Sequence, residues 1–316
     1  MTLSQANVPL WAVRGFAFAW GCLWGSFVNV VIYRVPRDMS VVRPGSHCPH
    51  CGAPVAAFDN VPVVSWLLLR GRARCCDAAI SPRYATVELL GGALALAVAE
   101  LVLYEVPEQA SVMYAAAVFV ADFALAMGLL AAAFIDAAHM YLPDPITIGG
   151  TLIGLATSSL RDTTWQGGLA GAAAGFFVVW LPLVVGYKAL RGRAGMGLGD
   201  AKLVMLAGAW FGWPGAAFAL FAGALQATLA AIGLLLIRGK IEEPEAVRED
   251  RLVLQRAAAA GDAEAQRALD DDPLANEPEA GLMSARLPFG PFLCLATIEW
   301  MLGGHWLREN VAWLRG

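Results

Sequence analysis

Long apolar stretches, separated by shorter polar segments, run through most of the chain. An α-helix needs about 20 apolar residues to cross the hydrocarbon core of a bilayer, and the recurring length of these stretches indicates membrane-spanning helices. The sequence Gly-Trp-Pro-Gly at 212–215 predicts a tight turn between two of them. The predicted spans lie at 10–32, 85–104, 112–135, 145–160, 167–187, 201–213, 214–237 and 288–306.

This pattern predicts an all-α polytopic membrane protein with about eight transmembrane helices. The stretch 201–213 is the shortest, so an arrangement of seven spans is the alternative. The first stretch has no Lys or Arg before Arg14 and ends without a small-residue cleavage site. We therefore interpret it as a retained helix rather than a signal peptide.

Composition supports a membrane protein. Hydrophobic residues make up 58% of the 316 residues and charged residues 15%, compared with about 25% charged residues in a typical soluble domain. Mean hydropathy is +0.59. Because so few charges cannot cover a water-facing surface, a soluble enzyme, a disordered protein and a nucleic-acid binder are poor matches, and the lipid bilayer is the expected surrounding.

Charge divides the chain into segments. A basic, Cys-containing segment follows the first helix, and 238–287 carries twelve acidic and seven basic residues. We interpret 238–287 as a solvated cytoplasmic insertion, helical in its Ala-rich part; the alternative is a docking site for a basic peptide or a partner. The expected segments are a first helix at 1–33, a cytoplasmic domain at 34–84, a transmembrane core at 85–237, the acidic insertion at 238–287, and a last helix with its tail at 288–316.

Basic loops indicate the orientation in the membrane. Loops rich in Lys and Arg face the cytoplasm, and such loops lie at 34–83, at 188–202 and around Arg238 and Lys240. This places both termini outside the cytoplasm. Arg308 and Arg315, at the predicted outer end, are exceptions.

Three aspartates, Asp136, Asp144 and Asp200, lie near the ends of apolar stretches on the predicted cytoplasmic side. Carboxylates in or near a bilayer are costly and mark functional sites. Two carboxylates held close together share one proton, so they can activate water and protonate a leaving amine. Gly197 and Gly199, just before Asp200, would let a substrate backbone approach. Helix capping and helix packing are the structural alternatives.

Four cysteines in the polar segment predict a structural zinc site. Cys48-Pro49-His50-Cys51 is followed by Cys75-Cys76, and a reducing cytoplasm favours metal binding over a disulfide. Adjacent cysteines are awkward ligands for one tetrahedral ion, so His47 or His50 is an alternative ligand. Free thiols or a redox pair are the other interpretations. Cys22 and Cys294, in apolar stretches, are expected to be packing residues.

The ordered motifs of the chain resemble those of type IV prepilin peptidases, the bifunctional leader peptidases and N-methyltransferases of type IV pilus and type II secretion systems. The resemblance covers nearly the whole chain except 238–287. Gly197-Leu198-Gly199-Asp200 matches the GxGD motif of these aspartyl proteases. The matching segments are 25–36, 48–51, 59–67, 80–84, 87–90, 135–136, 142–144, 197–202 and 288–292.

The resemblance implies that Asp136 and Asp200 are the catalytic pair and that Asp144, Gly197, Gly199 and Lys202 support them. It implies a multi-pass protein of the bacterial cytoplasmic (inner) membrane that cleaves the basic leader of prepilins or pseudopilins after a glycine, at the cytoplasmic face. S-adenosylmethionine would then donate a methyl group to the new N-terminal residue. Peptide hydrolysis by this pair needs no metal.

The family's loop has two Cys-x-x-Cys pairs, and this chain departs from that pattern. Ala73 occupies the first position of the second pair, while Cys76 keeps its place. The resemblance therefore carries Cys48, Cys51 and Cys76 over as zinc ligands, and Cys75 only as a substitute.

Three other functions are alternatives to this one. They are a peptidase that has lost methylation, a proton-coupled transporter that uses the three aspartates, and an inactive assembly scaffold. The sequence leaves open the choice of pilins or pseudopilins, the methyl-donor site, the role of the insertion and the oligomeric state.

Overall fold

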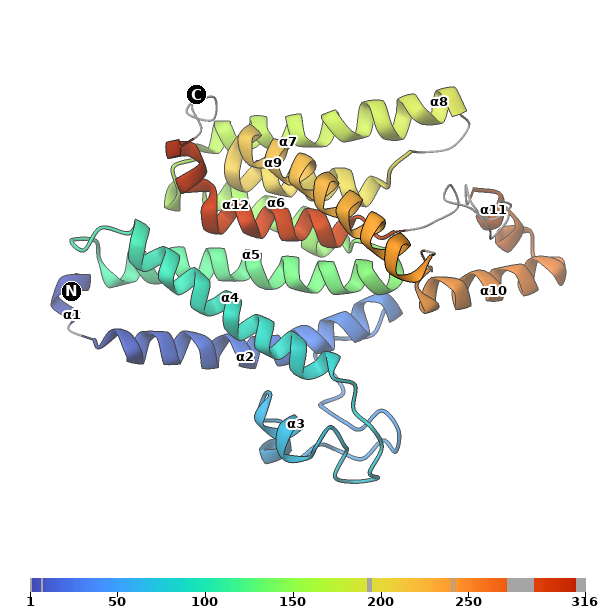
Figure 1. The fold of residues 1–316 in the computed structure, drawn as a ribbon, viewed down its shortest axis with the longest axis horizontal. Coiled ribbons are helices and arrows are strands. Elements are labelled where there is room, and N and C mark those ends of the chain that lie inside the picture. The colour runs from blue at the N-terminus through green and yellow to red at the C-terminus, as the bar shows by residue number, and fades with distance from the viewer. Residues whose placement is uncertain are drawn as a thin grey trace. The chain divides into compact units, whose positions relative to one another are not determined.

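The computed structural model describes residues 2–6, 8–191, 195–239, 241, 243–271 and 287–310 (Figure 1). These residues form helices and no β-strand, which confirms the predicted all-α class. Arg193, Lys240, Arg315 and the part of the predicted insertion at 272–286 lie outside the described residues. The helices are α1 (Leu3–Ala6), α2 (Leu10–Arg34), α3 (Val64–Leu68), α4 (Arg83–Glu105), α5 (Val112–His139), α6 (Asp144–Ala156), α7 (Trp165–Val179), the π-helix η4 (Trp180–Gly186), α8 (Tyr187–Arg191), α9 (Leu198–Arg238), α10 (Glu245–Ala259), α11 (Ala263–Asp271) and α12 (Gly290–Asn310).

Five helical segments among the described residues are long and apolar enough to cross a membrane, so the predicted count of eight is not confirmed. They are Leu10–Arg37, Arg83–Glu105, Val112–His139, Trp165–Leu190 and Leu198–Arg238. The predicted span at 145–160 corresponds to α6, which has only 13 residues. At 1.5 Å per residue it is about 20 Å long, which is too short to cross the hydrocarbon core by itself.

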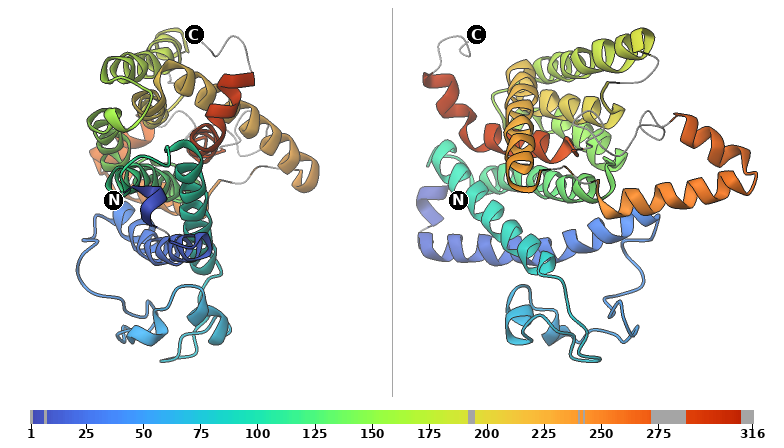
Figure 2. Two further views of the ribbon diagram at one scale, coloured as in Figure 1. Left: turned by 90° about the vertical axis from the view of Figure 1, so that its left-hand side faces the viewer. Right: turned by 45° about the vertical axis from the view of Figure 1, so that its right-hand side comes forward.

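Helix α9 contains two of the predicted spans. Its 41 residues include a kink at Gly212, where φ is 68° and ψ is −171°. Glycine adopts this backbone conformation without steric penalty, and Pro214 begins the next turn without needing a backbone donor. Figure 2 shows the two arms of α9 running in different directions. The break lies where the sequence predicted a turn.

The chain divides into two compact units, Met1–Ala131 with Leu160–Asp162, and Ala132–Ser159 with Thr163–Gly316. In the first unit, α2 and α4 pack closely through small residues. A side chain at Gly25 would lie 2.7 Å from the Glu88 Cα, and one at Gly91 would lie 3.0 Å from the Gly25 Cα. Such close backbone approach is typical of membrane helix pairs. At one end of the pair Arg14 donates two hydrogen bonds to Glu100.

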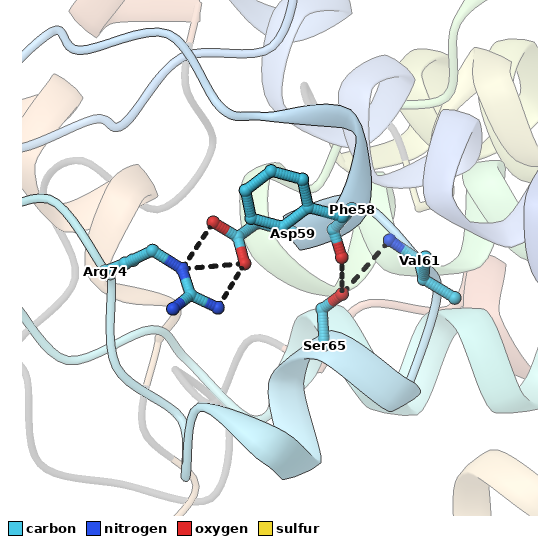
Figure 3. Close-up of polar contacts among 5 residues, drawn as sticks. All are labelled: Phe58, Asp59, Val61, Ser65 and Arg74. Atoms are coloured by element: carbon cyan, nitrogen blue, oxygen red, sulfur yellow. Dashed lines mark hydrogen bonds and ion pairs between the residues drawn. The ribbon is translucent and has the colours of Figure 1, made fainter.

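The polar segment between α2 and α4 is ordered by hydrogen bonds to its backbone. The buried Arg34 guanidinium donates to the Ser40 and Pro44 carbonyls at 2.9 and 2.7 Å. Glu88, on α4, accepts a 2.6 Å hydrogen bond from the Val63 N–H. The Ser65 hydroxyl donates to the Phe58 carbonyl at 3.1 Å and accepts the Val61 N–H at 3.1 Å (Figure 3).

In the second unit, the first arm of α9 packs against α6 and α7. The fully buried Trp210 donates its indole N–H to the Gly150 carbonyl at 2.8 Å. A side chain at Gly171 of α7 would lie 2.5 Å from the Gly208 carbonyl oxygen of α9. The other arm of α9 packs against α12, where the rings of Phe218 and Trp300 lie 5.2 Å apart. These contacts fix the start of α9 relative to α6.

The described part of the acidic insertion is helical, as its Ala-rich composition predicted. Helices α10 and α11 pack against each other around Ala265, which is 5% exposed. Gly261, with φ of 95°, separates them, and Arg251 forms a 2.6 Å ion pair with Glu243 just before α10.

Candidate active site

Asp136 lies near the C-terminal end of α5 and is 6% exposed. Its Oδ2 accepts a 2.9 Å hydrogen bond from the backbone N–H of Gly290, the first residue of α12. Hydrogen bonds from N–H groups stabilise the ionised form of a carboxyl group. A helix start therefore holds this buried carboxylate in place.

Asp200 lies in the first turn of α9, three residues after the N-cap residue Gly197. The capping alternative placed Asp200 at the N-cap, whereas the structure places Gly197 there. Its Oδ2 accepts the Gly197 N–H at 3.2 Å. Carboxylates are stabilised in this first turn by the helix dipole. The carboxyl groups of Asp200 and Asp136 interact electrostatically, so the structure brings together two acids that are 64 positions apart in the sequence.

Cys294 lies beside the two aspartates. It is fully buried in α12, and its thiol interacts electrostatically with both carboxylates. Because it follows Gly290 by four residues, both lie on the same face of α12. The sequence alone predicts only a packing role for Cys294 and assigns no role to Gly290. The sequence signal is the spacing of four residues between Cys294 and Gly290, which belongs to the 288–292 motif.

Asp144 and Lys202 form an ion pair, and each lies near one of the two acids in the sequence: Asp144 follows Asp136 by eight residues and Lys202 follows Asp200 by two. Lys202 Nζ lies 2.6 Å from Asp144 Oδ1, with side-chain exposures of 20% and 56%. Nearby, Leu142 packs against Gly199 of α9: a Cβ at Gly199 would lie 3.1 Å from the Leu142 Cβ. The missing side chain of Gly199 thus leaves room for Leu142.

The four cysteines of the polar segment form one cluster. The sulfurs of Cys48, Cys51, Cys75 and Cys76 lie within 4.8 Å of one another. The distances are 3.7 Å from Cys48 to Cys76, 3.3 Å from Cys51 to Cys75 and 3.9 Å from Cys75 to Cys76. Four sulfurs about 2.3 Å from a tetrahedral zinc ion are about 3.8 Å apart, so these residues fit zinc.

Two similar turns carry the cysteines. In the first turn, the Cys48 N–H donates to the Ala53 carbonyl and the Gly52 N–H donates to the Cys48 carbonyl. In the second turn, the Ala73 N–H donates to the Ala78 carbonyl and the Asp77 N–H donates to the Ala73 carbonyl. Ala73 thus occupies the position of Cys48, as the motif register predicted. Cys75 supplies the fourth sulfur, although adjacent cysteines had been expected to be awkward ligands.

The cluster has unequal thiol acidities. Hydrogen bonds from the backbone N–H groups of Cys51 and His50 lower the pKa of Cys48 to about 6. The hydrogen bond with Cys51 raises the pKa of Cys75 to about 12. Because cysteines bind a metal as thiolates, a bound metal would release thiol protons from the cluster.

The paired aspartates have the composition needed for acid–base hydrolysis. Two interacting carboxyl groups do not both ionise cheaply, so such a pair favours the state in which one member is protonated and the other ionised. The ionised member can take a proton from water, and the protonated member can give one to a leaving amine.

Comparison with known proteins gives two family matches. Residues 19–102 match the Bacterial Peptidase A24 N-terminal domain, and residues 123–232 match the Type IV leader peptidase family. The two matches cover the polar segment and the helices that carry both aspartates.

Curated relatives match over most of the chain. A prepilin leader peptidase/N-methyltransferase of Myxococcus xanthus is 35% identical, over 95% of this chain and 92% of its own length. Proteins of the same name from Aeromonas hydrophila and Neisseria gonorrhoeae are 36% and 35% identical, over 75% of this chain and 87% and 86% of their own lengths. No solved structure matches. The chain therefore belongs to the type IV leader peptidase family.

Proposed function

We propose that this protein is a membrane-embedded aspartyl endopeptidase that removes the basic leader peptide from type IV prepilins or type II secretion pseudopilins after a glycine. It then methylates the new N-terminal residue. The observation that carries the peptidase half is the match of residues 123–232, which include Asp136 and Asp200, to the Type IV leader peptidase family. The electrostatic interaction of the two carboxyl groups supports their pairing. The printed names of the relatives support both halves, whereas nothing supports the transporter alternative.

In this mechanism, the ionised carboxylate accepts a proton from a water molecule, which attacks the carbonyl carbon of the leader glycine. The protonated carboxyl group stabilises the carbonyl oxygen, and the proton then passes to the leaving amine. Burial of Asp136 excludes bulk water and strengthens these interactions. The scissile bond must be unwound locally, since helical hydrogen bonding hides it.

The proposed site faces the cytoplasm from the inner membrane, and the substrate's apolar segment lies among the transmembrane helices. The basic loops support this orientation by the positive-inside rule. The lipid bilayer and the membrane-anchored substrates are the partners. S-adenosylmethionine is the proposed methyl donor, because the relatives are named N-methyltransferases.

Zinc has a structural role in this proposal. Cys48, Cys51, Cys75 and Cys76 would hold it, and a bound ion would join the two cysteine turns. The aspartates carry out peptide hydrolysis without it.

Co-expression with a prepilin tests the proposal, with mass spectrometry of the substrate. We expect cleavage and methylation by the wild-type protein, and intact prepilin with Asp136→Asn or Asp200→Asn at normal membrane levels. Asp250→Asn, on α10, is the control for loss of a carboxylate. Normal cleavage by either active-site variant would overturn the assignment, and a cleaved but unmethylated product would favour the alternative of a peptidase alone.

A further inference from the structure

The start of α12 holds Asp136 through a glycine whose missing side chain leaves room for the carboxyl group. The Gly290 N–H donates to Asp136 Oδ2 at 2.9 Å. A Cβ at position 290 would lie 2.6 Å from that oxygen, 2.8 Å from the carboxyl carbon and 3.1 Å from the Asp136 Cβ. Gly290 does not have a positive φ, so space for Asp136, and not backbone conformation, requires glycine here.

We infer that Gly290 is a positioning residue for the proposed acid–base pair. The inference rests on the proposed function of Asp136 and adds α12 to its machinery. The Gly290 N–H belongs to the first turn of a helix, where backbone donors have no partner within the helix. Its hydrogen bond occupies Oδ2 and leaves Oδ1 of Asp136 to act on water.

Asp200 is held in the same way. Its Oδ2 accepts the N–H of Gly197 at the start of α9. Each aspartate therefore has one oxygen held by a glycine amide at a helix start, and no described residue forms a hydrogen bond with its other oxygen. Cys294, one turn beyond Gly290 on α12, interacts electrostatically with both carboxylates.

Gly290→Ala tests the inference directly. The new methyl group must displace the carboxyl group, and misplacement of a reacting group by about 1 Å lowers rates about 100-fold. We expect kcat for prepilin cleavage to fall about 10- to 100-fold, with a smaller change in KM, because the new methyl group displaces Asp136 itself. Gly303→Ala is the matched control, since it lies on the same helix with open space around its Cβ position. Wild-type kcat in Gly290→Ala would overturn the inference.

A double-mutant cycle on thermal stability separates positioning from general helix damage. Gly290→Ala, Asp136→Ala and the double variant are unfolded in detergent. Because Asp136→Ala removes the atoms that the new methyl group would meet, Gly290→Ala should lower Tm by a few degrees in the wild-type background and hardly at all in the Asp136→Ala background. Equal losses in both backgrounds would refute the coupling. An uncleaved substrate with the wild-type protein would refute the proposed function but leave the cycle unaffected.

Discussion

The ammonium group of Lys202 lies 2.6 Å from a carboxylate oxygen of Asp144, which joins the start of α9 to the start of α6. Lys202 follows Asp200 by two residues, and Asp144 follows Asp136 by eight. The ion pair thus connects the two segments that carry the proposed catalytic acids, and the packing of Leu142 against Gly199 reinforces the connection.

We therefore predict that Asp144 acts through Lys202 and not on the substrate. Asp144→Asn or Lys202→Met should reduce prepilin cleavage about 3- to 10-fold, because a loosened contact misplaces the reacting groups only slightly. The charge-reversed pair, Asp144→Lys with Lys202→Asp, should recover part of this loss. If Asp144→Asn abolishes cleavage as Asp136→Asn does and the reversed pair stays inactive, Asp144 has a direct catalytic role.

The cysteine cluster predicts that Cys75 is a metal ligand. Wild-type protein purified in detergent should contain about one zinc ion per chain, measured by elemental mass spectrometry. Cys75→Ser should lose zinc or bind it more weakly, since it removes one of four sulfurs. Cys22→Ala, which removes a buried thiol in α2, is the control.

Ala73 offers a stricter version of this test. Because Ala73 occupies the turn position of Cys48, the double variant Ala73→Cys with Cys75→Ser should regain the zinc that Cys75→Ser alone loses. Full zinc content in Cys75→Ser alone would show that three sulfurs and another ligand suffice.

The sequence predicted the helices because their apolar stretches and turn residues are local signals. The kink at Gly212 and the long helices α2, α4 and α5 were predicted in this way. Helix α6 was predicted too long, because 158–160, which is apolar only in part, belongs to a short 3-10 turn and not to the helix. The predicted count of eight is not confirmed, because α9 contains two of the predicted spans, α6 has 13 residues, and α12 is not among the five candidate spans of the described residues.

Of the candidate site, the sequence predicted only the residues that belong to recognisable motifs. Asp136 and Asp200 are conspicuous as acids in apolar surroundings, but the Gly290 N–H is a backbone group 154 residues from Asp136. No side-chain pattern reports such a contact. Likewise, the sulfur of Cys75 joins the cluster through the shape of its turn, which spacing alone did not predict.

Packing of α7 against α9 gives a stability prediction. A side chain at Gly208 would collide with the backbone of Gly171 and lie 2.8 Å from the Ala172 nitrogen. Gly208→Leu should therefore separate the helices and greatly reduce Tm or membrane accumulation, as expected for overpacking against a backbone that cannot yield. Gly233→Ala, which has open space around it in the other arm of α9, should be neutral. A stable Gly208→Leu protein would contradict this packing.

The ion pair between Arg74 and Asp59 predicts a pH dependence in the polar segment (Figure 3). Arg74 donates hydrogen bonds to both oxygens of Asp59 at 2.8 to 3.0 Å, and the Asp59 side chain is only 11% exposed. The hydrogen bonds from Arg74 lower the pKa of Asp59 below its ordinary value. The unfolded chain, with an ordinary pKa of about 3.9, therefore takes up a proton at a higher pH than the folded chain does.

The sign of the effect follows from this difference. The contribution of Asp59 to stability is fully present above about pH 5 and is lost as the pH falls through about 3.9 toward the lowered pKa. Carboxyl NMR titration of the detergent-solubilised protein should give a depressed pKa for Asp59, and Arg74→Gln should raise it. In thermal unfolding, the advantage of the wild-type protein over Asp59→Asn should shrink between about pH 5 and about pH 3. An Asp59 pKa that does not respond to Arg74→Gln would show that the pair does not persist in solution.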